Sequence, residues 1–321
     1  MTIKIIGTGI GLPSREFSND ELIELTGLDS SNEWIVSKSG IDSRYLCVTE
    51  TLTDLATAAA EQALADAGLG AKEIDYILIG TLGGEYCSPS LACAVAERIG
   101  ATSPAVDLNA GCVGFIYCLD TAAALISAGR AKNVLIIGAE KMSAHSDWTD
   151  RGTCVLFGDG AAACVVTAGT MLKYIQIRSA PDTQVLNIPE DMSGNWPLAG
   201  PKPADTFVHM DGPAVFKRAV TMVGREVQDA LTATGLAPEE IDFYLLHQAN
   251  RRIIDSAIKR LEQSPDRFPM NIQRHGNVSG ASIPLLLHQL RVEGKVEPGQ
   301  THLLCAFGSG MTVGTCLWVW E

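Results

Sequence analysis

Short apolar runs in the chain alternate with longer stretches in which apolar residues recur every three or four positions. Such runs, typical of buried strands, occur within residues 1–7, 76–80, 132–140, 243–246 and 300–308. The spacing after Pro213 predicts a helix that ends at Gly235, with an apolar face formed by Val215, Phe216, Ala219, Met222, Val223, Val227 and Leu231. Strands that alternate with amphipathic helices predict an α/β fold with mostly parallel, helix-covered sheets.

One of these patterns occurs twice. Residues 63–80 and 230–247 are 167 positions apart, agree at 8 of 18 positions, and each predict a helix end, a glycine stop and a buried strand. Residues 132–140 correspond in the same way to 300–308, and 109–114 to 277–282. We therefore predict two α/β halves, at residues 1–170 and 171–321. Because ligands bind where strand ends open onto loops, we expect the site at the seam between the halves.

Composition narrows the possible classes of protein. The chain has 321 residues, 46% of them hydrophobic, which is enough for a large core. A formal net charge of −13 argues against nucleic acid as a partner. The apolar runs are too short to span a membrane, and we expect no signal peptide before the first strand. Nine cysteines without a Cys-x-x-Cys pair indicate reduced thiols in the cytoplasm and no metal site.

Cys112 is the candidate nucleophile. It lies between an apolar strand and a helix of small residues, where the helix dipole and unpaired N–H groups favour the thiolate. His247 and Asn277 each follow an apolar segment in a polar or glycine-rich turn, which suggests nucleophilic acyl chemistry. Taken singly, the three residues could be a core thiol, a hydrogen-bonded structural histidine and a turn or N-cap asparagine. His275 near Asn277 does not make a metal pair by its spacing alone.

Several segments together resemble one family. They are residues 31–41, 107–115, 149–153, 157–160, 247–250, 274–277 and 306–310. With them the chain resembles, over nearly its whole length, the β-ketoacyl-acyl carrier protein synthase III branch of the thiolase-like condensing enzymes. The resemblance implies a duplicated thiolase-like αβαβα fold, a homodimer, and a catalytic triad of Cys112, His247 and Asn277.

The resemblance also implies a reaction. In that family the cysteine accepts an acyl group from acyl-CoA, malonyl-carrier protein loses CO₂, and the resulting carbanion attacks the acyl-cysteine in a Claisen condensation. A neutral histidine Nε2–H and an asparagine amide can stabilise the enolate oxygen that decarboxylation creates. The oxyanion of acyl transfer would meet the backbone N–H groups of Cys112 and Ser309, in a turn where the family usually has three glycines. No bound cofactor is implied; acyl-CoA and a malonyl thioester are substrates, and acyl carrier protein is a partner.

Residues outside the triad are assigned by the same resemblance. Trp34 and Arg151 match a pair that stacks on the adenine of CoA, and Lys38 stands where many members have an arginine. Further expected CoA contacts are Lys217, Asn250 and Arg252. A carrier-protein docking face is expected at Lys217, Arg252, Lys259 and Arg260. The alternative for these basic residues is an ordinary solvated helix face.

Ser88 is the predicted acyl-pocket residue. It matches a family position that reaches across the dimer interface, where a large aromatic residue restricts the pocket to short primers. A small serine predicts acceptance of primers longer than acetyl, or branched or aromatic ones, unless Tyr86 or Leu91 refills the space.

Two other functions remain open at this point. An acyltransferase of the same fold would pass the acyl group from the cysteine to an O, N or S acceptor without malonate. A catalytically inactive partner subunit is the other possibility, although an intact triad argues against it. A thiolase would need a second catalytic cysteine, and Cys305 lies inside a predicted strand.

Overall fold

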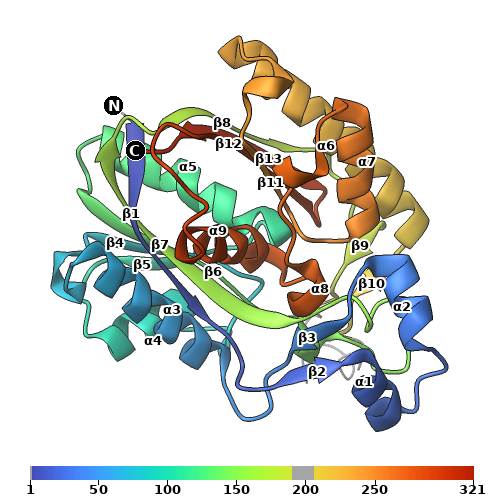
Figure 1. Ribbon diagram of the computed structural model, residues 1–321. Helices are drawn as coiled ribbons and strands as arrows, with labels where there is room; N and C mark the ends of the chain where they lie inside the picture. The colour runs from blue at the N-terminus through green and yellow to red at the C-terminus, as the bar shows by residue number, and fades with distance from the viewer. Residues whose placement is uncertain (1, 190–205) are drawn as a thin grey trace.

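Two mixed β-sheets form the framework of the computed structural model, which describes residues 2–189 and 206–321 (Figure 1). The first sheet has the order β1-β7-β6-β4-β5. Its strands are β1 (Thr2–Gly11), β4 (Tyr76–Gly80), β5 (Ala105–Leu108), β6 (Asn133–Lys141) and β7 (Asp159–Gly169). The second sheet, with the order β11-β12-β13-β8, contains β8 (Leu172–Ser179), β11 (Phe243–Leu246), β12 (Thr301–Gly308) and β13 (Thr312–Val319).

The expectation of mostly parallel sheets is wrong. Only the pairs β4–β5, β4–β6 and β11–β12 are parallel among the strands of these two sheets, and the other pairs are antiparallel. The reason lies in the connections: a parallel pair needs a crossover, usually a helix. No α-helix lies between β6 and β7 or between β12 and β13 in the described chain, so the chain returns antiparallel.

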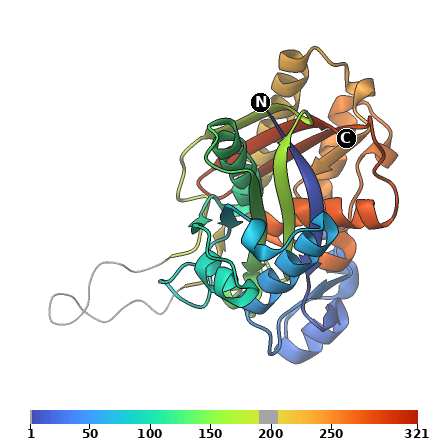
Figure 2. The same cartoon turned by 90° about the vertical axis from the view of Figure 1, so that its left-hand side faces the viewer.

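The helices form three layers around the two sheets (Figures 1 and 2). The central layer contains α5 (Gly114–Ser127) and α9 (Ser282–Val292), whose apolar residues share one core with both sheets. The first sheet is covered on its other face by α3 (Leu52–Ala67) and α4 (Leu91–Ile99). The second is covered by α6 (Gly212–Thr234) and α7 (Arg251–Leu261). The predicted αβαβα layering is therefore confirmed.

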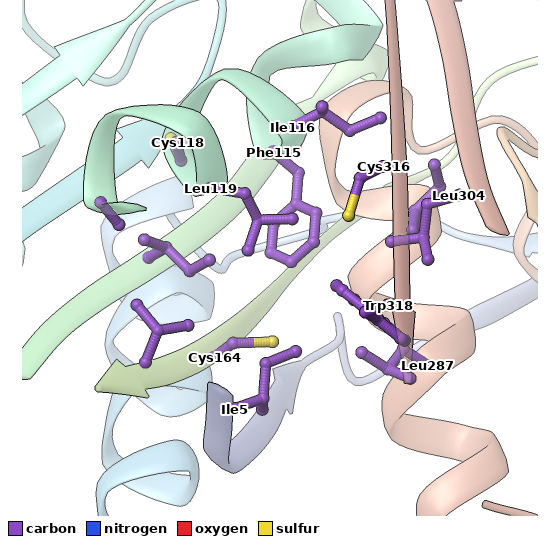
Figure 3. Close-up of a cluster of buried hydrophobic side chains, with 14 of the residues drawn as sticks. Ile5, Phe115, Ile116, Cys118, Leu119, Cys164, Leu287, Leu304, Cys316 and Trp318 are labelled. Atoms are coloured by element: carbon purple, nitrogen blue, oxygen red, sulfur yellow. The ribbon is translucent and has the colours of Figure 1, made fainter. Parts of the chain in front are cut away.

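The central core joins the two halves of the chain. Phe115 and Leu119 from α5 meet Leu287 from α9 and Trp318 from the second sheet, as Figure 3 shows. Ile5 approaches the same core from the first sheet (Figure 3). At about 1.5–3 kcal/mol for each fully buried large apolar side chain, this shared core strongly opposes separation of the halves.

The sequence repeat corresponds to a structural repeat. Helices α3 and α6 end at the left-handed glycines Gly68 and Gly235, and each is followed by a short 3₁₀ turn and a strand. Asp75 and Asp242 occupy equivalent positions before these strands and accept a hydrogen bond from a backbone N–H at the start of the neighbouring strand, Asn133 and Thr301 respectively.

The remaining short elements lie at the periphery or in the loops. They are β2 (Glu16–Ser18), β3 (Ser43–Tyr45), β9 (Leu186–Asn187), β10 (His209–Met210), α1 (Asn19–Thr26), α2 (Asn32–Ser39) and α8 (Ile272–His275). The described helices include none that is both long and apolar enough to cross a membrane.

Candidate active site

The structure brings the three residues of the predicted triad to one cavity. Cys112 lies on η2 (Gly111–Val113), His247 follows β11, and Asn277 lies between α8 and η6 (Ser279–Ala281). All three line a cavity of about 1360 Å³ whose walls come from both halves of the chain. The turns η2 and η6 occupy equivalent positions in the two repeats and pack against each other. The site therefore lies at the seam, where strand ends open onto loops.

Two backbone N–H groups near the Cys112 thiol are candidates for an oxyanion site: its own and that of Ser309. Gly111 adopts a φ of 54°, in the left-handed region that glycine tolerates, and the chain turns there into η2. A Cβ on Gly308 would lie 2.7 Å from the backbone N of Cys112, and one on Gly111 would lie 2.4 Å from the Oγ of Ser309. The β12–β13 turn thus lies directly against the nucleophile. The backbone N atoms of Cys112 and Ser309 lie on these two adjoining turns, where an oxyanion pair is predicted.

The thiol does not behave as its position at a helix start suggests. Burial raises the pKa of Cys112 to about 12, although a hydrogen bond with the Ser279 hydroxyl acts to lower it, and the charge of Glu140 raises it further. The expectation that the helix terminus favours the thiolate is therefore wrong for the free enzyme. Withdrawal of the sulfur from water outweighs the helix dipole, so the thiol must lose its proton as it attacks.

His247 is held as a neutral hydrogen-bond donor. Its ring is 2% exposed, and burial lowers its pKa to about 3. Nδ1 lies 2.6 Å from the Oγ of Ser282, which also accepts a 3.5 Å hydrogen bond from the backbone N–H of Gln248. A serine hydroxyl can donate one hydrogen bond and accept two, so the Nδ1 contact fits either imidazole tautomer. In the tautomer in which Ser282 donates to Nδ1, the imidazole proton is on Nε2, which is then the donor.

Asn277 has its carboxamide oriented by its own loop. Its Oδ1 accepts a hydrogen bond of 2.9 Å from the backbone N–H of Ser279, which leaves the Nδ2 amide as the end available to the cavity. The backbone of Asn277 is fixed as well, since its N–H donates to Leu156 O and its carbonyl accepts from Gly158 N. The site thus contains two preoriented neutral donors, His247 Nε2–H and Asn277 Nδ2–H, in one cavity with the thiol.

Three residues that support the site were missed by sequence reasoning. Ser282 orients His247, Ser279 orients Asn277 and contacts the thiol, and Glu140 binds the Ser279 hydroxyl at 3.0 Å. Glu140 could have been found from the sequence, because a carboxylate stands there at the end of an otherwise apolar strand. The two serines gave no signal, because serine near a helix start is common as a cap.

His275 and the 157–160 turn have structural roles. The His275 ring stacks on Tyr45 and contacts Gln289, and burial lowers its pKa to about 4. Asp159 accepts hydrogen bonds from Ser143 and from the backbone of Cys47, which fixes the turn. The described residues contain no cluster of three or more histidine, cysteine, aspartate or glutamate side chains that could hold a metal ion.

The predicted CoA residues are divided between the cavity and the surface. Trp34, Lys38, Arg151, Asn250 and Arg252 line the cavity. The guanidinium of Arg151 lies 5.1 Å from the centre of the Trp34 ring, and that of Arg252 lies 5.1 Å from the Phe216 ring. Asn250 caps α7 through Oδ1 and donates its amide to the carbonyl of Lys38, so its carboxamide already has two structural bonds.

The other predicted basic residues lie outside the cavity wall. Lys217 on α6 is exposed, and so are Lys259 and Arg260 on α7. Arg260 packs its guanidinium against Gly224 of α6. None of the three is among the residues that line the cavity. Arg252 alone of the four predicted docking residues lines the cavity, while the other three occupy exposed positions on α6 and α7.

Ser88 does not line the cavity of its own chain. It is exposed, whereas its neighbours Tyr86 and Cys87 do contribute to the wall. An apolar cluster that sequence reasoning missed lines this cavity instead: Leu82, Met142, Leu156, Phe157, Leu186, Ile188, Val208 and Met210. Within one chain, these residues and not Ser88 form an apolar surface suited to an acyl chain.

The αβαβα fold with a cysteine, a histidine and an asparagine at the seam defines a thiolase-fold condensing enzyme. The models for 3-oxoacyl-[acyl-carrier-protein] synthase III and for its C-terminal region match residues 106–180 and 231–320. The chain is 42% identical over 320 residues to β-ketoacyl-[acyl-carrier-protein] synthase III of Neisseria gonorrhoeae, with 98% of both chains covered. It belongs to the β-ketoacyl-acyl carrier protein synthase III family.

Solved structures agree with this assignment. The synthase III of Aquifex aeolicus superimposes with a TM-score of 0.92 at 39% identity, covering 99% of this chain and all of that one. A priming β-ketosynthase from the R1128 polyketide pathway superimposes with a TM-score of 0.91 at 31% identity, covering 100% of this chain and 96% of that one. The chain is therefore an acyltransferase of the condensing-enzyme class.

The protonation state of His247 is testable directly. Because burial lowers the pKa of His247 to about 3, below its usual 6.5, the ring should remain neutral from pH 8 down to pH 5. NMR spectra of histidine-labelled protein, with the His247 signal assigned from its loss in His247→Gln, should show no titration in this range. The ¹⁵N shifts should show the proton on Nε2. A midpoint near that of free imidazole would contradict this description of the site.

Proposed function

We propose that this protein transfers an acyl group from acyl-CoA to Cys112 and condenses it with malonyl-acyl carrier protein, releasing CO₂ and a 3-oxoacyl product. The observation that carries the proposal is the pair of neutral donors, His247 and Asn277, in one cavity with the thiol. Two donors are what an enolate oxygen requires during decarboxylation. A plain acyltransferase would need no second pair of donors besides the oxyanion N–H groups, so condensation is the better explanation.

In the acylation step, the Cys112 sulfur attacks the thioester carbonyl of acyl-CoA. The negative charge on the carbonyl oxygen is stabilised by the backbone N–H groups of Cys112 and Ser309. The carbon–sulfur bond to CoA then breaks, and CoA leaves as the thiolate. The acyl chain would lie against the apolar cluster that includes Met142, Phe157 and Val208.

In the condensation step, malonyl thioester binds with its carbonyl oxygen between His247 and Asn277. Loss of CO₂ leaves an enolate whose oxygen accepts hydrogen bonds from His247 Nε2–H and Asn277 Nδ2–H. The carbanion then attacks the acyl-cysteine, forms the new carbon–carbon bond and expels the Cys112 thiolate. No protein group has to remove a proton from malonate, because decarboxylation itself creates the nucleophile.

Both substrates would enter past the CoA-binding residues. Trp34 and Arg151 would stack on adenine, while Lys38 and Arg252 would attract phosphate. Stacking on both faces of a purine needs two contacts of about 3.5–4 Å. The present 5.1 Å between the guanidinium and the ring leaves no room for the base, so the pair must separate when CoA binds. CoA acts as a carrier of substrate, and no bound cofactor is required.

Acyl carrier protein would dock beside the mouth of the cavity. The chain as a whole has a net charge of −13, so a local group of positive side chains at Lys217, Arg252, Lys259 and Arg260 stands out. Such a group would attract an acidic partner and orient its pantetheine arm. Arg252 alone of the four lines the cavity, so it would contact the arm or CoA as well.

A homodimer and a cytoplasmic location complete the proposal. Strand β5 lies at an edge of the first sheet, with Val106 39% exposed, and Tyr86 in a nearby loop is 61% exposed. An unpaired edge beside exposed apolar side chains favours association with a second copy. All nine cysteines are free thiols, which agrees with a reducing compartment.

The two chemical steps can be separated by mutation. Cys112→Ala should abolish the mass increase that acyl-CoA produces in the intact protein. His247→Ala and Asn277→Ala should still become acylated but lose about 10²–10³-fold in condensation with malonyl-acyl carrier protein, since each removes one preoriented donor. Normal condensation in both variants would instead favour the plain acyltransferase.

Docking of the carrier protein can be separated from CoA binding. Lys259→Glu should raise KM for malonyl-acyl carrier protein, with a strong salt dependence, and leave acylation by acyl-CoA unchanged. Arg252→Glu should weaken both steps, because Arg252 also lines the cavity. Lys72→Glu, on the exposed turn η1 (Ala71–Glu73) at the opposite end of β4, is the matched control. Equal effects of Lys259→Glu on both substrates would rule out a docking role.

The acyl chain length accepted should depend on two positions. The wild type should accept acyl-CoA primers longer than acetyl, because the wall of the cavity is apolar and each added buried methylene contributes about 0.8 kcal/mol. Val208→Phe should shift the preference to shorter primers by filling this space within one chain. Ser88→Phe should do so only if the partner subunit inserts this residue into the pocket. Strict preference of the wild type for acetyl-CoA would contradict the open pocket.

A further inference from the structure

The Cys112 thiol has no proton acceptor among the three triad residues. The Nδ1 atom of His247 contacts the Ser282 hydroxyl, and in the mechanism proposed above its Nε2 carries the proton. Asn277 presents an amide donor. Because these groups donate hydrogen bonds, none of them can remove the proton that must leave when the sulfur attacks a thioester.

A second set of groups approaches the thiol from the opposite turn. Ser279 lines the same cavity as Cys112, and its turn η6 packs against η2. Its hydroxyl acts to lower the pKa of the thiol and donates a 3.0 Å hydrogen bond to Oε1 of Glu140. Glu140 is 1% exposed at the end of β6, and its Oε2 accepts a 3.2 Å hydrogen bond from the backbone N–H of Leu82. Within the described residues, the carboxyl group has hydrogen-bond donors around it but no basic side chain. Burial of a carboxyl group without a basic partner lowers the stability of the fold, so such a group is retained where it has a function.

Ser279 has an unusual backbone for its residue type. Its φ is 42°, in the left-handed region that glycine and asparagine enter most easily. Its side chain is 1% exposed, and its backbone N–H donates a hydrogen bond to Oδ1 of Asn277. A strained conformation at a non-glycine residue is retained where the side chain or the geometry is needed. Here the hydroxyl binds Glu140 from a turn that packs against the turn of the thiol.

We propose that Ser279 and Glu140 form a proton relay for the nucleophile, in which the thiol proton passes to the Ser279 oxygen as the Ser279 proton passes to the Glu140 carboxylate. The proposal rests on the acyl-cysteine step described above. During acylation the sulfur–carbon bond forms, CoA leaves as the thiolate, and Glu140 becomes the neutral acid. During condensation the expelled Cys112 thiolate takes its proton back through Ser279, and Glu140 is again a carboxylate. Protons and charges balance over the cycle.

The relay predicts a specific pH dependence. Burial raises the pKa of Glu140 to about 8, so the accepting carboxylate becomes more abundant as the pH rises through that value. The acylation rate should therefore increase with pH and level off above about 8, once the Glu140 carboxylate is fully formed. Among the described residues, no charged side chain contributes to the pKa shift of Glu140. Lys141, the next residue along β6, donates to Glu50 O, and Asp159, which pairs with Lys141 on β7, accepts from Ser143.

The test is single-turnover acylation by acyl-CoA, followed by intact-protein mass, between pH 6 and 10. Ser279→Ala and Glu140→Gln should lower the rate at least about 10²-fold near pH 8, because general-base assistance typically contributes 10²–10⁴-fold. Their rates should rise continuously with pH, following the thiolate fraction of Cys112, without levelling off near pH 8. Ser279→Ala keeps the backbone N–H that orients Asn277 and leaves the Leu82 bond to Glu140 in place. It therefore reports on the relay even if Glu140→Gln folds poorly. Glu226→Gln, at a buried carboxylate of α6 remote from the cavity, is the control and should behave as wild type.

The possible results are distinguishable. A rate and pH profile like those of the wild type in Ser279→Ala would overturn the relay, whatever the condensation assay shows. A lowered rate that still levels off near pH 8 would also overturn it, since that pattern indicates a structural role only. The assay needs no malonyl substrate. If the wild type acylates but does not condense malonyl-acyl carrier protein, the proposed function fails while the relay is still decided.

Discussion

The site depends on close backbone contact between the two halves at the seam. A Cβ on Gly308 would lie 2.7 Å from the backbone N of Cys112, and one on Gly138 would lie 2.4 Å from Gly280 O. These glycines let β12 approach η2 and β6 approach η6. Because packed interiors tolerate little displacement, this contact fixes the distances among the thiol, the histidine and the asparagine.

The duplication explains how the two halves acquired different roles. With the repeat offsets, Gly80 corresponds to His247, Glu140 to Gly308, and Cys112 to Gly280. At each corresponding pair one half has a glycine where the other has a functional side chain. The scaffold of turns and strand ends is thus used twice, and each half leaves space for the reactive group of the other.

Burial determines the charge state of the site. It raises the pKa of Cys112 to about 12 and that of Glu140 to about 8, and it lowers that of His247 to about 3. All three shifts favour the neutral form, as expected when ionisable groups are withdrawn from water. A site of neutral donors suits a reaction whose negative charge is brought by the substrates, first on the thioester oxygen and then on the enolate.

The sequence alone determined the fold class and the repeat, and it singled out the three candidate residues that share the cavity. Apolar periodicity and glycine stops are local, and the motif around Cys112 is distinctive enough to indicate its chemistry. The strand directions, the raised pKa of Cys112 and the roles of Ser279, Ser282 and Glu140 were decided only by the tertiary structure. Each depends on groups far apart in the chain: Glu140 meets Ser279 from 139 positions away. Desolvation and hydrogen-bond partners are properties of the packed molecule, so the order of residues does not specify them directly.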